Sequence, residues 1–267
     1  MALNITKVYV DSRFKTRSSS SNTDFKFTIN QSIDLPDNCY CYIDDVQIPH
    51  TWYSVEDFNN KLYFQQDNAG VVTNKILTLS IQNHTGTSLA SNLQSLLNTE
   101  FGGGSYVVAY NTNKGTITIT SQEAQRMFQI FTEEEMHSNM PGWDIPYEEN
   151  LKSANEIFRL SSTMGSVNSY ETGFLDLLNI HSLYLRSSNL GSFQTIGARG
   201  ESDIIKKIPV SSGYGYLIID TVVSNHDKID VSRQTLKTLE FRLTNVKGEV
   251  VDLHGAHVSW SLVFVQE

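Results

Sequence analysis

Strand-like segments near both ends of the chain constrain its fold more than any other feature. Residues 25–29 and 39–48 near the front, and 236–243 near the back, have the composition of short β-strands. Residues 257–265 close the pattern, because alternate positions there are apolar: Val258, Trp260, Leu262 and Phe264. Alternation at period two places one set of side chains on one face of a sheet, as a half-buried strand requires. We therefore expect the two ends to build one β-sandwich.

The long middle of the chain predicts a separate, smaller module. One helix is expected over residues 89–101, with candidate N-caps at Thr85, Thr87 and Ser88 and with glycines at 102–104 to end it. The other elements expected after residue 55 are a short helix around 151–160 and strands at 61–65, 76–81, 106–110, 116–120, 182–186, 204–209 and 216–223. The sequence thus predicts a mainly β chain, with a sandwich interrupted by an α+β insertion.

Size and charge narrow the class of protein. At 267 residues the chain is near the upper size for one hydrophobic core, which suits a large domain with a smaller one embedded in it. A charged fraction of 18% is too low for a disordered chain, and the formal net charge of −9 disfavours wide contact with nucleic acid. The first seven residues lack the apolar segment of a signal peptide, and no apolar run approaches the roughly 20 residues that span a bilayer. We expect synthesis in a cytosol-like compartment.

The sequence contains no recognisable catalytic motif. It has no nucleophile elbow, no phosphate-cradling glycine loop and no His-Glu-x-x-His zinc motif. The nearest approach to a metal-ligand cluster is Asp252, His254 and His257, which we interpret as surface residues of a hairpin. Cys39 and Cys41 lie on the same side of one predicted strand and are expected to be buried free thiols. We expect no enzyme activity, no cofactor and no bound metal.

Two blocks of short motifs occupy the ends of the chain. The front block consists of VDSR at 10–13, NTDF at 22–25, LPDN at 35–38, DDVQIP at 44–49 and TWY at 51–53. The back block consists of LYLRSSNL at 183–190, DIIKKIP at 203–209, LEFRLTN at 239–245, VDL at 251–253, VSWSLVF at 258–264, and glycines at 248 and 255. In their order and spacing, these blocks resemble the penton, or minor capsid, proteins of virophages, Polintons and Polinton-like viruses.

The resemblance implies a particular architecture and assembly. Residues 24–55 and 171–267 would form a single antiparallel jelly-roll sandwich, and residues 56–170 would form the inserted α+β domain. The chain would be a homopentamer at the fivefold vertices of an icosahedral shell, with double-jelly-roll major capsid proteins as neighbours. Its location would be the virion capsid, assembled in the host cell. A double jelly roll itself needs a chain about twice this long, so the minor capsid role fits better.

Residues 1–23 are expected to form an N-terminal arm. Positions 11–23 combine three basic residues with a run of four serines, which has little apolar surface to offset its ordering entropy. The arm is either a solvated tail or a segment that docks on another subunit or faces packaged nucleic acid. In the second case Arg13, Lys15 and Arg17 would make the contact.

Four aromatic residues are candidates for subunit contacts, because assembly interfaces are enriched in aromatic side chains: Trp52, Tyr53, Tyr214 and Tyr216. The alternative is that these residues close the sandwich core. An alternative function is a receptor- or glycan-binding jelly-roll module of a viral spike or fibre, with the inserted domain as the contact to a host receptor. A jelly-roll enzyme of cupin type would need several histidines and a carboxylate converging inside the barrel, and the spacing of these residues does not provide that.

Overall fold

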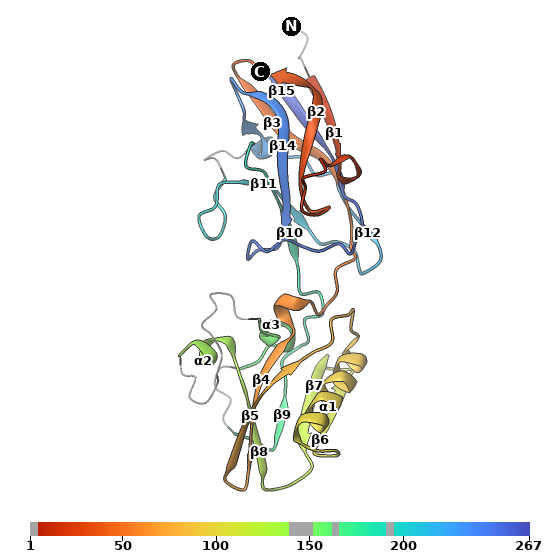
Figure 1. The fold of residues 1–267 in the computed structure, drawn as a ribbon, viewed down its shortest axis with the longest axis vertical. Coiled ribbons are helices and arrows are strands. Elements are labelled where there is room, and N and C mark those ends of the chain that lie inside the picture. Colours follow the sequence, from red (N-terminus) through yellow and green to blue (C-terminus); the bar gives the residue numbers. More distant parts are fainter. Residues whose placement is uncertain (1–4, 139–151, 162–165, 191–194) are drawn as a thin grey trace. The chain divides into compact units, whose positions relative to one another are not determined.

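The structure is a computed structural model that describes residues 5–138, 152–161, 166–190 and 195–267. The chain divides into two compact units. The terminal unit joins Met1–Trp52 to Ile180–Glu267, and the inserted unit is Tyr53–Asn179. Both units are built around antiparallel sheets (Figure 1), and the prediction of a mainly β chain is confirmed.

The described part of the terminal unit contains two sheets in which every pairing is antiparallel. The first sheet has the order β1 (Ile5–Asp11), β15 (Ser259–Gln266), β3 (Cys39–Pro49) and β12 (Leu217–Asp220), and the short β13 (Ile229–Asp230) also pairs with β3. The second sheet has the order β11 (Ile204–Pro209), β10 (Ser182–Arg186), β14 (Thr235–Thr244) and β2 (Asp24–Asp34). The 3-10 helices η1 (Ser12–Phe14) and η3 (Asn225–Asp227) lie in the connections. The first and last strands of the chain are therefore neighbours.

Three aromatic rings join the two sheets of the terminal unit face to face. The ring of Trp260 on β15 lies 5.6 Å from that of Phe25 on β2 and 4.9 Å from that of Phe241 on β14. All three side chains are buried. Strand alternation places Leu262 and Phe264 on the same face of β15 as Trp260, and both are buried too. The alternating apolar residues of β15 thus contribute to the core of the sandwich, as their pattern in the sequence predicts.

Most strand predictions for the terminal unit are confirmed. The bounds of β10 and β11 are those predicted, β3 is one residue longer at its end, and β14 is one residue longer at each end. β2 continues five residues beyond the predicted 25–29 strand, and β12 is shorter than the predicted 216–223. Cys39 and Cys41 are buried free thiols, as expected. Burial raises the pKa of the Cys41 thiol to about 12, so it stays protonated and unreactive at neutral pH.

The structure differs from the predicted arm over residues 1–23. Residues 5–11 form β1, an edge strand that pairs with β15 along its whole length. The segment after it is also held in place, because the Ser12 amide donates to the Val258 carbonyl at 3.0 Å and the Thr16 amide donates to the Lys26 carbonyl at 2.8 Å. β1 escapes prediction because an edge strand contributes few side chains to the core, and only Val10 of its residues is fully buried.

The inserted unit contains two three-stranded sheets and three helices among its described residues. One sheet has the order β5 (Val71–Thr78), β4 (Lys61–Asn68) and β8 (Arg126–Phe131), and the other has the order β6 (Tyr106–Asn111), β7 (Thr116–Ser121) and β9 (Ser169–Glu171). The helices are α1 (Gly86–Phe101), α2 (Glu133–Ser138) and α3 (Asn155–Phe158), with a 3-10 helix η2 (Asp57–Asn59) before β4. These elements enclose a hydrophobic core of their own.

The predicted helix of the inserted unit is confirmed as α1. Thr85 is its N-cap, since the Thr85 hydroxyl accepts from the Ser88 amide at 3.2 Å while the Ser88 hydroxyl accepts from the Thr85 amide at 2.9 Å. Gly86 opens the helix against the Tyr110 ring, where an added Cβ would lie 2.3 Å from a ring carbon. The helix therefore starts at the one residue type that fits there. Its buried side consists of Leu89, Ala90, Leu93 and Leu97.

Other predictions for the inserted unit are confirmed in part. The β6–β7 hairpin lies where it was predicted. β5 spans Val71–Thr78 rather than 76–81, because it pairs with all eight residues of β4. β8 was not predicted, although alternate residues along it are buried. α3 lies within the short helix expected around 151–160, whose first residue is outside the described part of the chain.

Candidate subunit interface

The four aromatic candidates for subunit contacts occupy different environments. Trp52 is 1% exposed and stacks on the His50 ring with 4.0 Å between ring centroids, so it belongs to the core and cannot be offered to a neighbour. Trp52 therefore helps to close the core, which was the alternative to a subunit contact. Tyr53 is half-buried at the start of the inserted unit. Tyr214 and Tyr216 are exposed, at 43% and 72%.

Tyr214 and Tyr216 are part of a larger apolar strip along β12, an edge strand of the first sheet. β12 pairs with β3 on one side, and Leu217 and Ile219 alternate along it with the buried Ile218. We call the exposed set the β12 ridge; it consists of Tyr214, Tyr216, Leu217, Ile219, Val222 and Val223. All six are at least 41% exposed. Contiguous exposed apolar side chains of this kind mark interaction surfaces in soluble proteins.

Buried His50 anchors the start of the β12 ridge. The His50 amide donates to the Tyr216 carbonyl at 2.9 Å, and the Gly215 amide donates to the His50 carbonyl at 2.8 Å. The imidazole Nδ1 lies 2.7 Å from the Ser212 carbonyl oxygen, and the Tyr214 ring meets the imidazole edge-on at 6.3 Å. Gly215 has a φ of +85°, which favours glycine. The segment that carries the two exposed tyrosines is therefore fixed to the core strand β3.

This anchor predicts a pH-dependent stability. Burial lowers the pKa of His50 below its ordinary value of 6.5, and the hydrogen bond to Ser212 opposes the shift without cancelling it. The unfolded chain therefore takes up this proton before the folded chain does, so the contribution of neutral His50 is present above about pH 6.5 and is lost as the pH falls below that. We expect wild-type protein to lose thermal stability relative to His50→Phe as the pH falls below about 6.5. Parallel stability profiles for the two proteins would contradict this.

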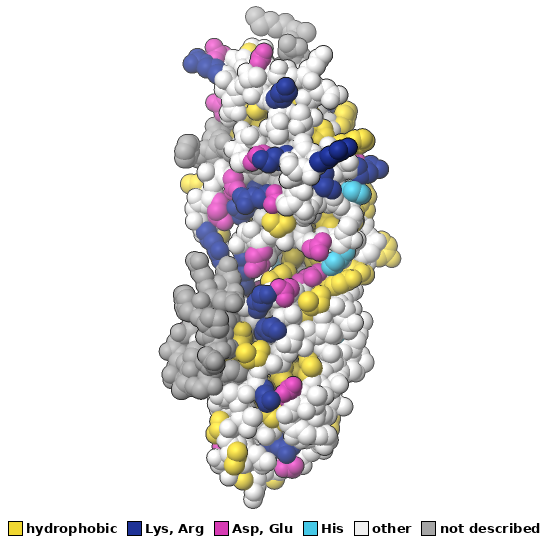
Figure 2. Space-filling view, in the orientation of Figure 1, with side chains coloured by type: hydrophobic (Ala, Val, Ile, Leu, Met, Phe, Trp, Pro, Cys, Tyr) yellow, Lys and Arg dark blue, Asp and Glu magenta, His cyan; other side chains and the backbone are white. Residues whose placement is uncertain are grey.

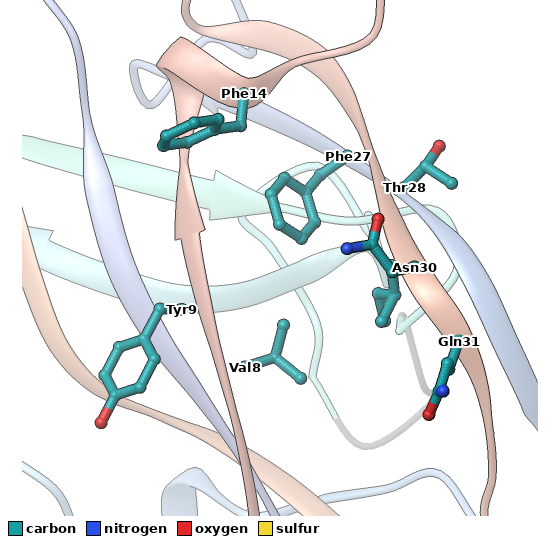
Figure 3. Close-up of a pocket in the computed structure, with 8 residues that line it drawn as sticks. Val8, Tyr9, Phe14, Phe27, Thr28, Asn30 and Gln31 are labelled. Carbon is teal, nitrogen blue, oxygen red and sulfur yellow. The ribbon is translucent and has the colours of Figure 1, made fainter.

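A groove lies at the opposite edge of the sandwich, between β1 and β2. It has a volume of 780 Å³ and is apolar where Val8, Tyr9, Phe14, Phe27 and Ile29 line it (Figure 3). The polar side chains that complete the lining all come from β2: Thr28, Asn30 and Gln31. We call this the β1–β2 groove. Two of its aromatic side chains, Tyr9 and Phe14, are each 73% exposed.

An irregularity in β2 helps to leave this edge open. Leu236 of β14 pairs with Ile33, whereas Thr238 pairs with Thr28, so β2 has three more residues than β14 over this stretch. Such a bulge interrupts the ladder and bends the strand. The other edge is tied together by Lys206 of β11, whose ammonium donates to the Val222 carbonyl at 2.8 Å and lies 3.5 Å from the Asp220 carboxylate. The sandwich therefore has one tied edge, which carries the ridge, and one open edge, which carries the groove.

Comparison with known proteins identifies the architecture. No family model and no curated protein matches the sequence. Among solved structures, the mavirus penton protein superposes with a TM-score of 0.52 at 11% identity, covering 99% of this chain and 100% of the penton protein. A chain from the cryo-EM structure of the Sputnik virophage superposes with a TM-score of 0.51 at 10% identity, covering 98% of each chain. The chain has a virophage penton-like fold. The likeness extends over both units, so the insertion belongs to the shared architecture.

Two of the three basic residues expected to contact a neighbour or nucleic acid have partners within the penton-like fold. Arg13 forms an ion pair with Asp11 at 2.5 Å, and this interaction lowers the pKa of the Asp11 carboxyl. The Lys15 ammonium donates to the Asn22 side-chain oxygen at 2.5 Å. Arg17 is exposed. The charge of Arg13 is therefore balanced by Asp11, and the Lys15 ammonium has a hydrogen-bond acceptor within the chain.

The residues that came nearest to a metal-ligand set are separated in the penton-like structure. The His254 ring lies 2.7 Å from the Thr51 carbonyl oxygen, and the His257 ring lies 3.1 Å from the Ser12 hydroxyl. The Asp252 carboxylate accepts from the His254 amide at 2.8 Å. No group of three or more His, Cys, Asp or Glu residues in the described chain is arranged to hold a metal ion. None of its described helices is long and apolar enough to cross a membrane.

Sequence reasoning found two residues of the β12 ridge and missed the β1–β2 groove. The ridge was found in part, because residues 216–223 were predicted to be a strand and Tyr214 and Tyr216 were named as candidate contacts. The groove depends on Tyr9 and Phe14, which are isolated large apolar residues in a polar segment. Two large apolar residues isolated in a polar segment were the signal in the sequence that indicates an apolar surface there. His50 gave none, since a lone histidine at a strand end carries no indication of its partners.

Proposed function

We propose that the protein is a structural capsid subunit, a penton that forms homopentamers at the fivefold vertices of an icosahedral shell. The observation that carries this proposal is the end-to-end likeness to the mavirus penton protein, with both units covered. An assembly role is also consistent with the surface of the terminal unit, where nine of its twelve described exposed large apolar side chains lie on or beside two edge strands.

The strand order of the terminal unit supports a jelly roll. Leaving out the two-residue β13 and numbering the remaining strands from one to eight in chain order, the sheets read 1-8-3-6 and 5-4-7-2. Eight antiparallel strands in two packed sheets, with the first and last strands side by side, form the jelly-roll arrangement that capsid proteins commonly use. The inserted unit then occupies the connection between the third and fourth strands, β3 and β10.

The mass of the purified protein tests the proposal. Five copies of a 30.1 kDa chain give an assembly of about 150 kDa, measurable by light scattering or native mass spectrometry. We expect this species to persist on dilution into the low micromolar range. A 30.1 kDa species at every concentration, together with no binding to a double-jelly-roll major capsid protein, would contradict the proposal.

A receptor- or glycan-binding role for the inserted unit is the second candidate. It is supported by the exposed edge strand β5, where Val71, Val72 and Ile76 are 67%, 55% and 43% exposed. An exposed strand edge can add a partner strand or present apolar side chains to a ligand. Binding of the full-length protein to a glycan array or to host cells, reduced by changing Val71 and Val72 to serine, would support it. The two roles are compatible in one vertex protein.

A further inference from the structure

Exposed apolar side chains are concentrated at the two free edges of the first sheet. Twelve large apolar side chains are exposed in the described part of the terminal unit, and nine of them lie on or beside β1 and β12. These strands are the outer strands of the order β1-β15-β3-β12, so they lie at opposite edges of one sheet. In a monomer both apolar edges stay in contact with water. A subunit that contacts a neighbour on each side buries both of them.

We propose that neighbouring copies of this chain join head to tail, with the β12 ridge of one copy seated in the β1–β2 groove of the next. This inference rests on the proposed pentamer and names its contact. The ridge supplies projecting side chains, including Tyr216 and Val222 at 72% and 74% exposed. The groove supplies a hollow of 780 Å³ that is lined by five apolar and three polar side chains. One copy therefore carries both halves of the contact on opposite edges.

A ring requires this arrangement rather than a symmetric one. A contact that pairs the ridge with a second ridge is isologous and closes at two copies, which leaves the groove unfilled. A contact between two different surfaces is heterologous, and repeating it around a rotation axis generates a closed ring. Pairing ridge with groove lets one contact, repeated around a single rotation axis, use both apolar edges in every subunit.

Strand direction is compatible with the contact. Three antiparallel pairings separate β1 from β12, so the two strands run in opposite directions within one subunit. A rotation axis along the strands leaves strand directions unchanged in the neighbouring copy. The neighbour's β12 then runs antiparallel to β1, which is the relation of every pair already present in this sheet.

Charge does not oppose the contact. The charged side chains beside the groove are already paired, with Lys7 2.5 Å from Asp44 and Arg13 2.5 Å from Asp11, and Lys206 beside the ridge faces Asp220. Closing the contact therefore leaves these charges with their partners, which avoids the cost of an unpaired buried ion. From the sequence, residues 53–179 carry a net charge of −8 and the terminal unit only −1. Lys or Arg and Asp or Glu side chains are intermixed over the terminal unit in Figure 2.

Two charge substitutions at exposed positions test the proposal. Tyr216→Asp places a negative charge on the ridge, and Phe14→Asp places one in the groove. Both side chains are more than 70% exposed, so folding should be unaffected. Each variant alone is expected to shift from about 150 kDa to about 30 kDa. Val246→Asp, at a residue of the terminal unit that is 53% exposed but distant in sequence from both edge strands, is the matched control and should remain at about 150 kDa. Circular dichroism and thermal melting verify the fold of all three.

Mixing the two variants gives the decisive result. The Phe14→Asp protein keeps an intact ridge and the Tyr216→Asp protein keeps an intact groove, so equal amounts should form a 1:1 complex of about 60 kDa that grows no further. If the wild type is pentameric and either single variant stays pentameric, the head-to-tail contact is overturned while the proposed function stands. If only Tyr216→Asp dissociates, the ridge binds a surface other than the β1–β2 groove, and the proposed contact is overturned. A wild type that is monomeric at every concentration overturns the proposed function itself.

Discussion

Replacing Trp260 with alanine is expected to lower the free energy of unfolding of the terminal unit by about 3–5 kcal/mol. Trp260 is 3% exposed and its ring contacts Phe25 and Phe241, so it is the side chain through which the two sheets meet. Removing it leaves a large cavity that the strands of both sheets cannot fill without breaking their ladders. Urea unfolding followed by near-ultraviolet circular dichroism measures the loss.

Two controls separate ring volume from other effects at Trp260. Trp260→Phe keeps a ring between the sheets and removes no hydrogen bond to a described residue, because the indole Nε1 has no partner among them. It should cost about 1–2 kcal/mol. Val246→Ala, at an exposed position, should change stability by less than about 0.5 kcal/mol. A loss below about 1 kcal/mol for Trp260→Ala would mean that the two sheets do not depend on this contact.

Phe64→Ala is expected to have an equally large effect, about 3–5 kcal/mol, on the inserted unit. Phe64 is fully buried, stacks on Phe128 with 5.2 Å between centroids, and meets Tyr106 edge-on at 5.5 Å. The core around it consists of side chains from the inserted unit alone. Hydrogen exchange should therefore show lost protection in α1 and the β6–β7 hairpin, while β3 and β15 keep theirs.

The matched variants for this prediction are Phe64→Leu and Val71→Ala. Phe64→Leu retains most of the buried volume and should cost about 1–2 kcal/mol. Val71 is 67% exposed, so its truncation should leave exchange unchanged. Equal loss of protection in β3 and β15 on Phe64→Ala would show that the two units unfold as one cooperative body.

The core strands could be predicted from the sequence because burial imposes a regular pattern on them. Buried side chains alternate along β3 and along parts of β10 and β14, and the predicted bounds of these strands and of β11 are correct to within one residue. Helix α1 was equally predictable, since its cap, its buried leucines and its terminating glycines are all local signals. The resemblance to virophage penton proteins came from the two motif blocks at the ends of the chain. Periodicity alone does not indicate it.

The edges of the sandwich could not be predicted in the same way. β1 contributes one fully buried residue, so its pattern resembles that of a polar arm. Trp52 follows a strand and precedes the insertion, where nothing in the sequence distinguishes a buried aromatic from an exposed one. The β1–β2 groove arises from three extra residues in β2 relative to β14, two strands about 200 positions apart in the sequence. Only the long-range register reveals it.

The insertion lies between β3 and β10, which belong to different sheets, so the chain leaves and re-enters the sandwich once. No ladder of the terminal unit includes a described residue of 53–179. Residues 53–179 can therefore change in sequence or length without breaking a described strand pairing of the terminal unit. The two units are thus free to diverge at different rates.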